Sequence, residues 1–447
     1  MEKIKFSILT FSLIFILLFF NNNDIQLYGF TTYLIQLSFV FYLLIRKNNN
    51  HIYLLSPSFL TILYSSLTFG FGHYVVSRNI GFKDIYYLKF IQYENLWFIT
   101  SFFLISNLIV FNAIPFKSFK TYNYSKNIFK TGPIKALLFL FILLTLNLFA
   151  ERFPDLGDFI YPLKLTVVIF ISFLLKGFVL PIRLFFYLIE LFLIGLQHWD
   201  SKREILFVLI FIVFYEIIAN NINLRIKIKH LASILGVLCL AFYIIIVSSI
   251  SRGYGEYNVD GNPVKASSHI IDFLSSDIAI DAFAANFELS YGYGHSSNAV
   301  DIVYRNPLDL LFGSTLIKFL FIPIPRSVWE DKPRSVIDIY TSIFDPSFRS
   351  VGGSYPISFF SELFWNFHLF GLLLLFLMFN LLNKGYYLMV IKMNRGKTSA
   401  YLIFLIFMYS TFIQFIRGSG IELWLVYGII SIPFTYLLIL LKKIVLR

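Results

Sequence analysis

Three cationic residues, Arg326, Lys332 and Arg334, lie within nine positions of one another in the stretch IPIPRSVWEDKPRSV. A guanidinium group binds phosphate oxygens through two parallel hydrogen bonds and keeps its charge in poorly hydrated surroundings. A cluster of this kind could therefore stabilise negative charge that develops on a departing phosphate group. The acidic neighbours Glu330 and Asp331 favour a different interpretation, in which the cations form ordinary surface ion pairs.

Further candidate ligands for an anionic or sugar-bearing group lie near predicted helix ends. Arg203 follows QHWDSK, Arg417 lies in FIRGSGIE, and Arg349 lies between the cationic stretch and a Gly-Gly turn. Tyr291 and Tyr293 lie in the turn-like stretch LSYGYGHSSN, where their rings could form platforms for sugars. Tyrosines are also common at membrane interfaces without binding any ligand, so a role in interface anchoring alone stays open for these two residues.

One carboxylate is placed to act as a base. Glu362 begins the stretch ELFWNF in the first turns of a predicted helix, and a carboxylate within reach of a hydroxyl can remove its proton. The helix dipole would also stabilise a purely structural carboxylate there, so both roles stay open. The sequence has no Walker loop, GxSxG, HExxH or Cys/His metal spacing, and we expect no metal or other cofactor.

The elements that must position these residues are membrane helices. The 447-residue chain is 58% hydrophobic and 14% charged, whereas soluble domains carry about 25% charged residues. Apolar runs long enough to cross a bilayer recur along its length, which predicts an all-α polytopic membrane protein. We predict about twelve transmembrane helices, at residues 6–20, 25–45, 52–76, 96–114, 133–150, 160–175, 179–196, 204–220, 231–250, 357–382, 398–416 and 421–441.

The charge pattern orients these helices. The loops on one side of the membrane, together with both termini, hold about three times as many lysines and arginines as the short loops on the other side. Because lysine and arginine concentrate in cytoplasmic loops, both termini are predicted to be cytoplasmic. The net charge of +12 then belongs to cytoplasmic loops, and nucleic acid is not an expected partner. Residues 1–250 hold helices one to nine, 251–356 form one large external loop before the tenth helix, and 357–447 hold helices ten to twelve. The apolar stretch near 307–325 is expected to be an interfacial helix within this loop, or a re-entrant segment.

The late external loop and the motifs around it resemble the O-antigen polysaccharide polymerases of the Wzy type. In that family an arginine and a Lys-Pro pair precede a Gly-rich turn, and a glutamate then begins a helix that contains Asn-Phe-Gly. His368 stands where the family has glycine, with Gly371 three residues later, which puts the close packing of this helix in question. The resemblance covers about residues 320–371, and the remainder matches in topology only. The matching positions are Arg326, Lys332–Pro333, Gly352–Gly353, Glu362 and Asn366–Phe367.

The resemblance implies a metal-independent, GT-C-like membrane glycosyltransferase in the bacterial inner membrane. It would join undecaprenyl-diphosphate-linked oligosaccharide repeat units into O-antigen or capsular polysaccharide on the outer face. Its partners would be the lipid-linked oligosaccharide, membrane lipid, a chain-length regulator and a flippase. The expected catalytic residues are Arg326, Lys332, Arg334, Glu362 and Arg203, and the expected substrate-binding residues are Arg349, Arg417, Tyr291 and Tyr293.

Two other functions are compatible with parts of this pattern. An O-antigen ligase, or another lipid-sugar transferase, would use the same chemistry with a different acceptor. A flippase for the same lipid-linked unit would also have about twelve spans, but its charges should line a central cavity instead of gathering outside.

Overall fold

Over the residues that it describes, the computed structural model is all-helical and contains no strand. This agrees with the predicted all-α class. The described residues are 2–19, 25–45, 51–71, 95–115, 138, 139, 141, 142, 145, 157–175, 178–197, 202–219, 228–251, 253, 255, 257–259, 262–279, 282, 291–321, 324, 327–395, 398–409, 412 and 415–445.

The N-terminal part contains the first predicted helices, one of which is divided. A new helix begins at Pro57 because proline cannot donate a hydrogen bond to a preceding turn. The Ser56 hydroxyl caps this helix by accepting a hydrogen bond from the Phe59 amide (3.3 Å). The elements are α1 (Glu2–Phe19), α2 (Ile25–Ile45), η1 (Ile52–Leu55), α3 (Pro57–Ser65), the π-helical turn η2 (Ser66–Phe71) and α5 (Leu96–Asn112).

Four helices in the middle of the chain agree with their predicted ranges within a few residues. The helix predicted over 133–150 lies almost wholly outside the described residues. The four helices are α7 (Gly157–Leu175), α8 (Leu180–Gln197), α9 (Lys202–Ala219) and α10 (Ile228–Ser251).

Two predictions for the segment 251–356 are wrong. Within the stretch LSYGYGHSSN, the residues from Tyr291 on form the first turns of helix α14 instead of a turn. Burial of Tyr293, Ala299 and Val303 outweighs the low helix propensity of glycine. Residues 306–313 are non-helical, so 307–325 is not one interfacial helix; Phe312 and Gly313 have positive φ angles, which a helix cannot continue through. The helices are α11 (Pro263–Ser268), α12 (Ile270–Leu274), α14 (Tyr291–Arg305), α15 (Ser314–Ile317), η8 (Lys318–Phe321), α16 (Val336–Phe344) and α17 (Pro346–Ser350).

The tenth predicted helix is broken into two. His368 has φ 51° and ψ −140°, which ends the first part and turns the chain before the second begins at Gly371. A Cβ on Gly371 would lie 2.6 Å from the Leu363 carbonyl oxygen, so this glycine permits the close packing that His368 had put in question. The C-terminal elements are α18 (Phe359–Phe367), η9 (His368–Phe370), α19 (Gly371–Asn394), α20 (Thr398–Tyr409), η10 (Phe415–Ser419) and α22 (Ile421–Val445).

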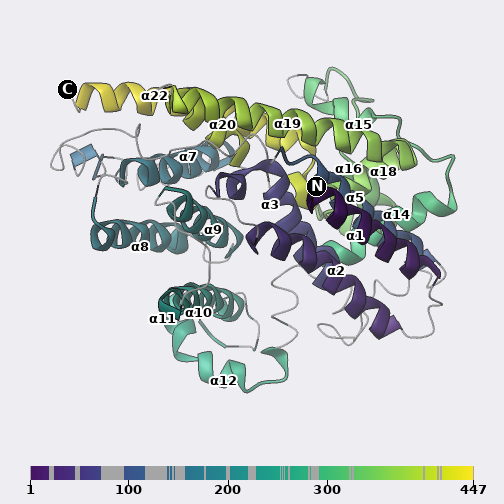
Figure 1. Ribbon diagram of the computed structural model, residues 1–447, viewed down its shortest axis with the longest axis horizontal. Helices are drawn as coiled ribbons and strands as arrows, with labels where there is room; N and C mark the ends of the chain where they lie inside the picture. The colour runs from purple at the N-terminus through teal and green to yellow at the C-terminus, as the bar shows by residue number, and fades with distance from the viewer. Residues whose placement is uncertain are drawn as a thin grey trace.

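Two stretches are long and apolar enough to cross a membrane, Phe359–Met393 and Ile421–Ile444. This result rests on their length and composition and agrees with the predicted membrane class at this coarse level. Helices α20 and α22 pack against each other and against α7. The segment from α14 to α18 gathers at the end of the molecule away from the C-terminus, as Figure 1 shows. There α14 packs against α18, which places part of the 251–356 segment beside α18.

Candidate active site around Glu362

Glu362 is held at the start of α18 by a well-capped first turn. The Ser358 hydroxyl accepts a hydrogen bond from the Ser361 amide (3.2 Å) and so provides the N-cap. Helix α14 holds this turn through two hydrogen bonds of Ser296. The Ser296 hydroxyl accepts from the Ser358 amide, and the Ser296 carbonyl accepts from the Ser361 hydroxyl (both 2.9 Å). The Glu362 side chain is consequently buried, with 1% of the residue exposed.

A chain of hydrogen bonds from the long loop reaches one carboxylate oxygen of Glu362. The Thr315 hydroxyl donates to Oε1 (2.8 Å), while the Asn366 amide donates to the same Thr315 oxygen (2.8 Å). Because Asn366 already donates to that oxygen, the hydroxyl proton of Thr315 points to Glu362. Among the described residues, the hydrogen bond that the Glu362 side chain accepts reaches Oε1.

The loop residues that make this contact are locked onto α18. The Gly313 amide donates to the Asn366 side-chain oxygen (2.8 Å), and the Trp365 indole donates to the Asp309 carbonyl (3.1 Å). Gly313 has φ 83°, which suits glycine and allows its backbone to turn towards the helix. Thr315 was not predicted as a functional residue, since nothing local in the sequence distinguishes it from any other helical threonine.

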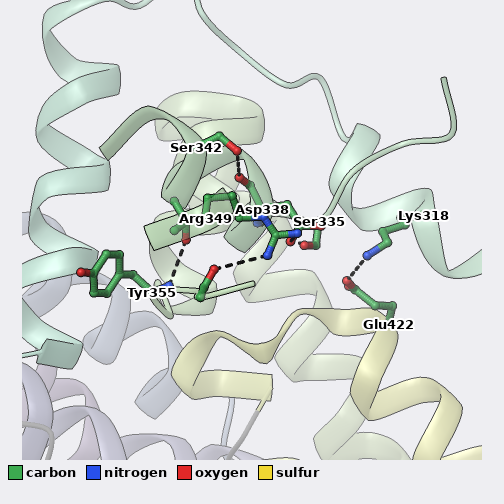
Figure 2. Close-up of polar contacts among 9 residues, drawn as sticks. Lys318, Ser335, Asp338, Ser342, Arg349, Tyr355 and Glu422 are labelled. Atoms are coloured by element: carbon green, nitrogen blue, oxygen red, sulfur yellow. Dashed lines mark hydrogen bonds and ion pairs between the residues drawn. The ribbon is translucent and has the colours of Figure 1, made fainter. Parts of the chain in front are cut away.

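An ion pair lies next to Glu362. The Lys318 ammonium contacts Oε1 of Glu422 (2.9 Å), as Figure 2 shows, and both side chains are mostly shielded, with 17% and 11% exposed. The charges of Lys318 and Glu422 both act on the Glu362 carboxyl group. Glu422 lies in the first turn of α22, where the helix dipole also favours a carboxylate.

Arg417 belongs to the turn that precedes α22. The turn packs directly against the start of α18, because a Cβ on Gly418 (φ 121°) would collide with the backbone of Ile357. Gly420 (φ 86°) leaves room for the Glu422 carboxylate in the same way. Arg417 is half-buried in this turn, so one of the predicted substrate-binding residues lies close in the fold to the helix that carries Glu362.

The predicted cations that the structure describes have different surroundings. Arg349 forms an ion pair with Asp338 (2.7 Å) and donates to the Gly353 carbonyl, as Figure 2 shows. Lys332 donates to the Ile324 carbonyl (2.9 Å), and Arg334 is exposed. Arg326 lies outside the described residues.

The structure places the other predicted site residues separately. Tyr293 is buried with 1% exposed, so its ring does not form a surface platform for a sugar. Tyr291 is the first residue of α14 and Arg203 the second residue of α9, and their side chains lie outside the described part of the structure. Among the described residues, no three His, Cys, Asp or Glu side chains gather in a way that could hold a metal ion.

His295 fixes α14 to α16. Its Nδ1 lies 2.8 Å from the Tyr340 hydroxyl oxygen, which also accepts a hydrogen bond from Asn298 (3.1 Å). The imidazole stacks on the Tyr355 ring, with centroids 4.2 Å apart. Burial lowers the pKa of His295 to about 3, so the ring is neutral at physiological pH, and burial raises the pKa of Tyr340. His295 thus has a structural role beside the turn that positions Glu362.

Comparison of the chain with protein-family models, with curated proteins and with solved structures finds no match in any of the three.

Proposed function

We propose that this protein is a membrane glycosyltransferase that joins lipid-diphosphate-linked oligosaccharide units, with Glu362 as the base. The observation that carries this proposal is the position of Glu362: its carboxylate is buried at the start of α18, and Thr315 holds Oε1. A carboxylate held in this way is suited to remove a proton from an acceptor hydroxyl.

In the proposed reaction the acceptor hydroxyl attacks the anomeric carbon of the donor sugar. A new carbon–oxygen bond forms, the bond from the anomeric carbon to the diphosphate breaks, and its electron pair leaves with the diphosphate. The hydroxyl proton passes to the carboxylate of Glu362. Cations such as Arg417 would stabilise the charge that develops on the leaving diphosphate, as arginines do at other phosphate groups.

The proposed topology places this reaction on the outer face of the bacterial inner membrane. It has about twelve spans, both termini in the cytoplasm and 251–356 outside. Three observations support it: the Lys/Arg distribution, the two long apolar helices and the separation of the α14–α18 segment from the C-terminus in Figure 1. The donor and the acceptor would then be undecaprenyl-diphosphate-linked repeat units, and the product O-antigen or capsular polysaccharide.

A gel of surface polysaccharide from a strain that lacks this gene tests the proposal. The ladder should collapse to carriers that bear a single repeat unit, and the wild-type gene should restore it. Loss of every repeat unit from the surface would contradict a polymerase and would indicate a ligase or a flippase. Accumulation of lipid-linked polymer on the outer face would then identify the ligase.

A further inference from the structure

Lys318 lies within one helical turn of Thr315, the residue that donates to Glu362, whereas the loop cations Lys332 and Arg349 contact other groups. It follows α15, the short helix whose residue Thr315 donates to Glu362. The base and this cation are therefore positioned by one continuous piece of the long loop.

The contacts of Lys318 leave part of its ammonium group available. Among the described residues the ammonium donates only to Glu422, and an ammonium carries three N–H donors. A mostly buried ion pair is no efficient source of stability, because desolvation of both charges offsets their attraction. The observed geometry therefore favours a use of Lys318 beyond its pairing with Glu422.

We propose that Lys318 binds the diphosphate of the lipid-linked donor next to Glu362, with Glu422 holding the ammonium in place. This inference rests on the proposed function. A displacement reaction requires its leaving group on the far side of the anomeric carbon from the attacking hydroxyl, so a base and a diphosphate-binding cation must flank one sugar. Lys318 is a candidate for this cation because it follows Thr315 in the same loop segment and contacts α22, while Thr315 donates to Glu362. Lys318 thus takes the role that the sequence had assigned to Lys332 and Arg334.

Binding of farnesyl diphosphate to the purified full-length protein, measured by calorimetric titration, tests the inference directly. Lys318→Met should weaken binding at least about tenfold, as expected for loss of a charge-assisted hydrogen bond, whereas Lys318→Arg should stay within about threefold of the wild type. Glu422→Gln keeps a side-chain oxygen that can accept from the ammonium but loses the carboxylate charge, so it should lose less binding than Lys318→Met. The matched control is Lys384→Met, at an exposed position on α19.

Unchanged binding of farnesyl diphosphate by Lys318→Met would overturn the inference, and so would equal losses in Lys318→Met and Glu422→Gln. Displacement of farnesyl diphosphate by an equal concentration of phosphatidylglycerol would also overturn it, because the site would then not distinguish a diphosphate from a phospholipid headgroup. If Lys318→Met does not fold, the double variant with Glu422→Gln removes both buried charges together and should still lose binding. Failure of the proposed function is a separate result. A surface ladder unaffected by loss of the gene would refute polymerisation and leave the binding result standing.

Discussion

Two glutamates of this protein, Glu362 and Glu216, occupy apolar helices and are treated differently by their surroundings. Glu216 on α9 has both oxygens occupied, since Arg183 contacts Oε2 (2.9 Å) and the Tyr187 hydroxyl donates to Oε1 (2.7 Å). Glu362 on α18 receives one hydrogen bond, from the neutral Thr315 hydroxyl. The first carboxylate has a direct cationic partner, and the second is held by a neutral hydroxyl.

This difference is the one expected between a carboxylate with a structural role and a carboxylate that acts as a base. Both oxygens of Glu216 on α9 are held by partners on α8, Arg183 and Tyr187, so this carboxylate joins the two helices. A buried carboxylate held by a neutral hydroxyl can exchange a proton with a ligand. Residue type alone did not distinguish the two, because both glutamates lie in apolar runs of the sequence.

The largest expected effect comes from neutralising each glutamate in turn. Glu362→Gln keeps the size of the side chain and removes the base, so transfer per folded molecule should fall by about a hundredfold or more. Glu216→Gln should destabilise the protein by roughly 3 kcal/mol, because it leaves Arg183 without its counter-ion, and transfer per folded molecule should stay normal.

Both variants are measured in the same preparation, by polymer formation from lipid-linked repeat units and by thermal unfolding. The Lys384→Met protein serves as control for the loss of a charge at an exposed position. Normal transfer by Glu362→Gln, or a selective loss of transfer in Glu216→Gln, would break the comparison.

Acid should weaken the region around Glu362 through His295. This imidazole has a pKa of about 3 in the folded protein against 6.5 in the unfolded chain, so the unfolded chain binds more protons between these values. Stability is therefore lost as the pH falls below about 6.5, by about 2 kcal/mol between pH 7 and pH 5. Thermal unfolding of the wild type and of His295→Phe at the two pH values checks this. A pH dependence that persists unchanged in His295→Phe would contradict the prediction.

Replacing the donor to Glu362 should have a moderate effect. Thr315→Val removes the hydrogen bond to Oε1, so transfer should fall by about tenfold through misplacement of the base. Thr315→Ser keeps the hydroxyl and should restore most of the rate, which a purely packing role of the methyl group would not predict. Steady-state kinetics should show the loss in kcat with KM little changed. Equal rates for the valine and serine variants would show that Glu362 needs no such orientation.

The smallest expected effect concerns the end of α18. The backbone of His368 has φ 51° and ψ −140°, a conformation that glycine adopts easily and other residues adopt at a cost. His368→Gly should therefore stabilise the protein by about 1 kcal/mol, even though the ring contact with Phe364 is lost. His368→Ala loses the same ring without relieving the backbone, so it should not be more stable than the wild type. Thermal unfolding distinguishes the two.

The sequence by itself determined the all-helical class, the membrane character and most helix boundaries, because apolar runs and helix-ending residues act locally. It also singled out Glu362 and Arg417. It did not predict helix α14, whose glycines favour a turn until burial against α18 outweighs them.

Only the tertiary structure decided which side chains surround Glu362. Thr315 is 47 positions away in the chain, and Lys318 meets Glu422 across 104 positions. Contacts over such separations depend on how helices pack, and packing follows from the burial of many apolar side chains together, which no short motif records. Residue types thus singled out Glu362 as the proposed base, while the fold decided which hydroxyl contacts it.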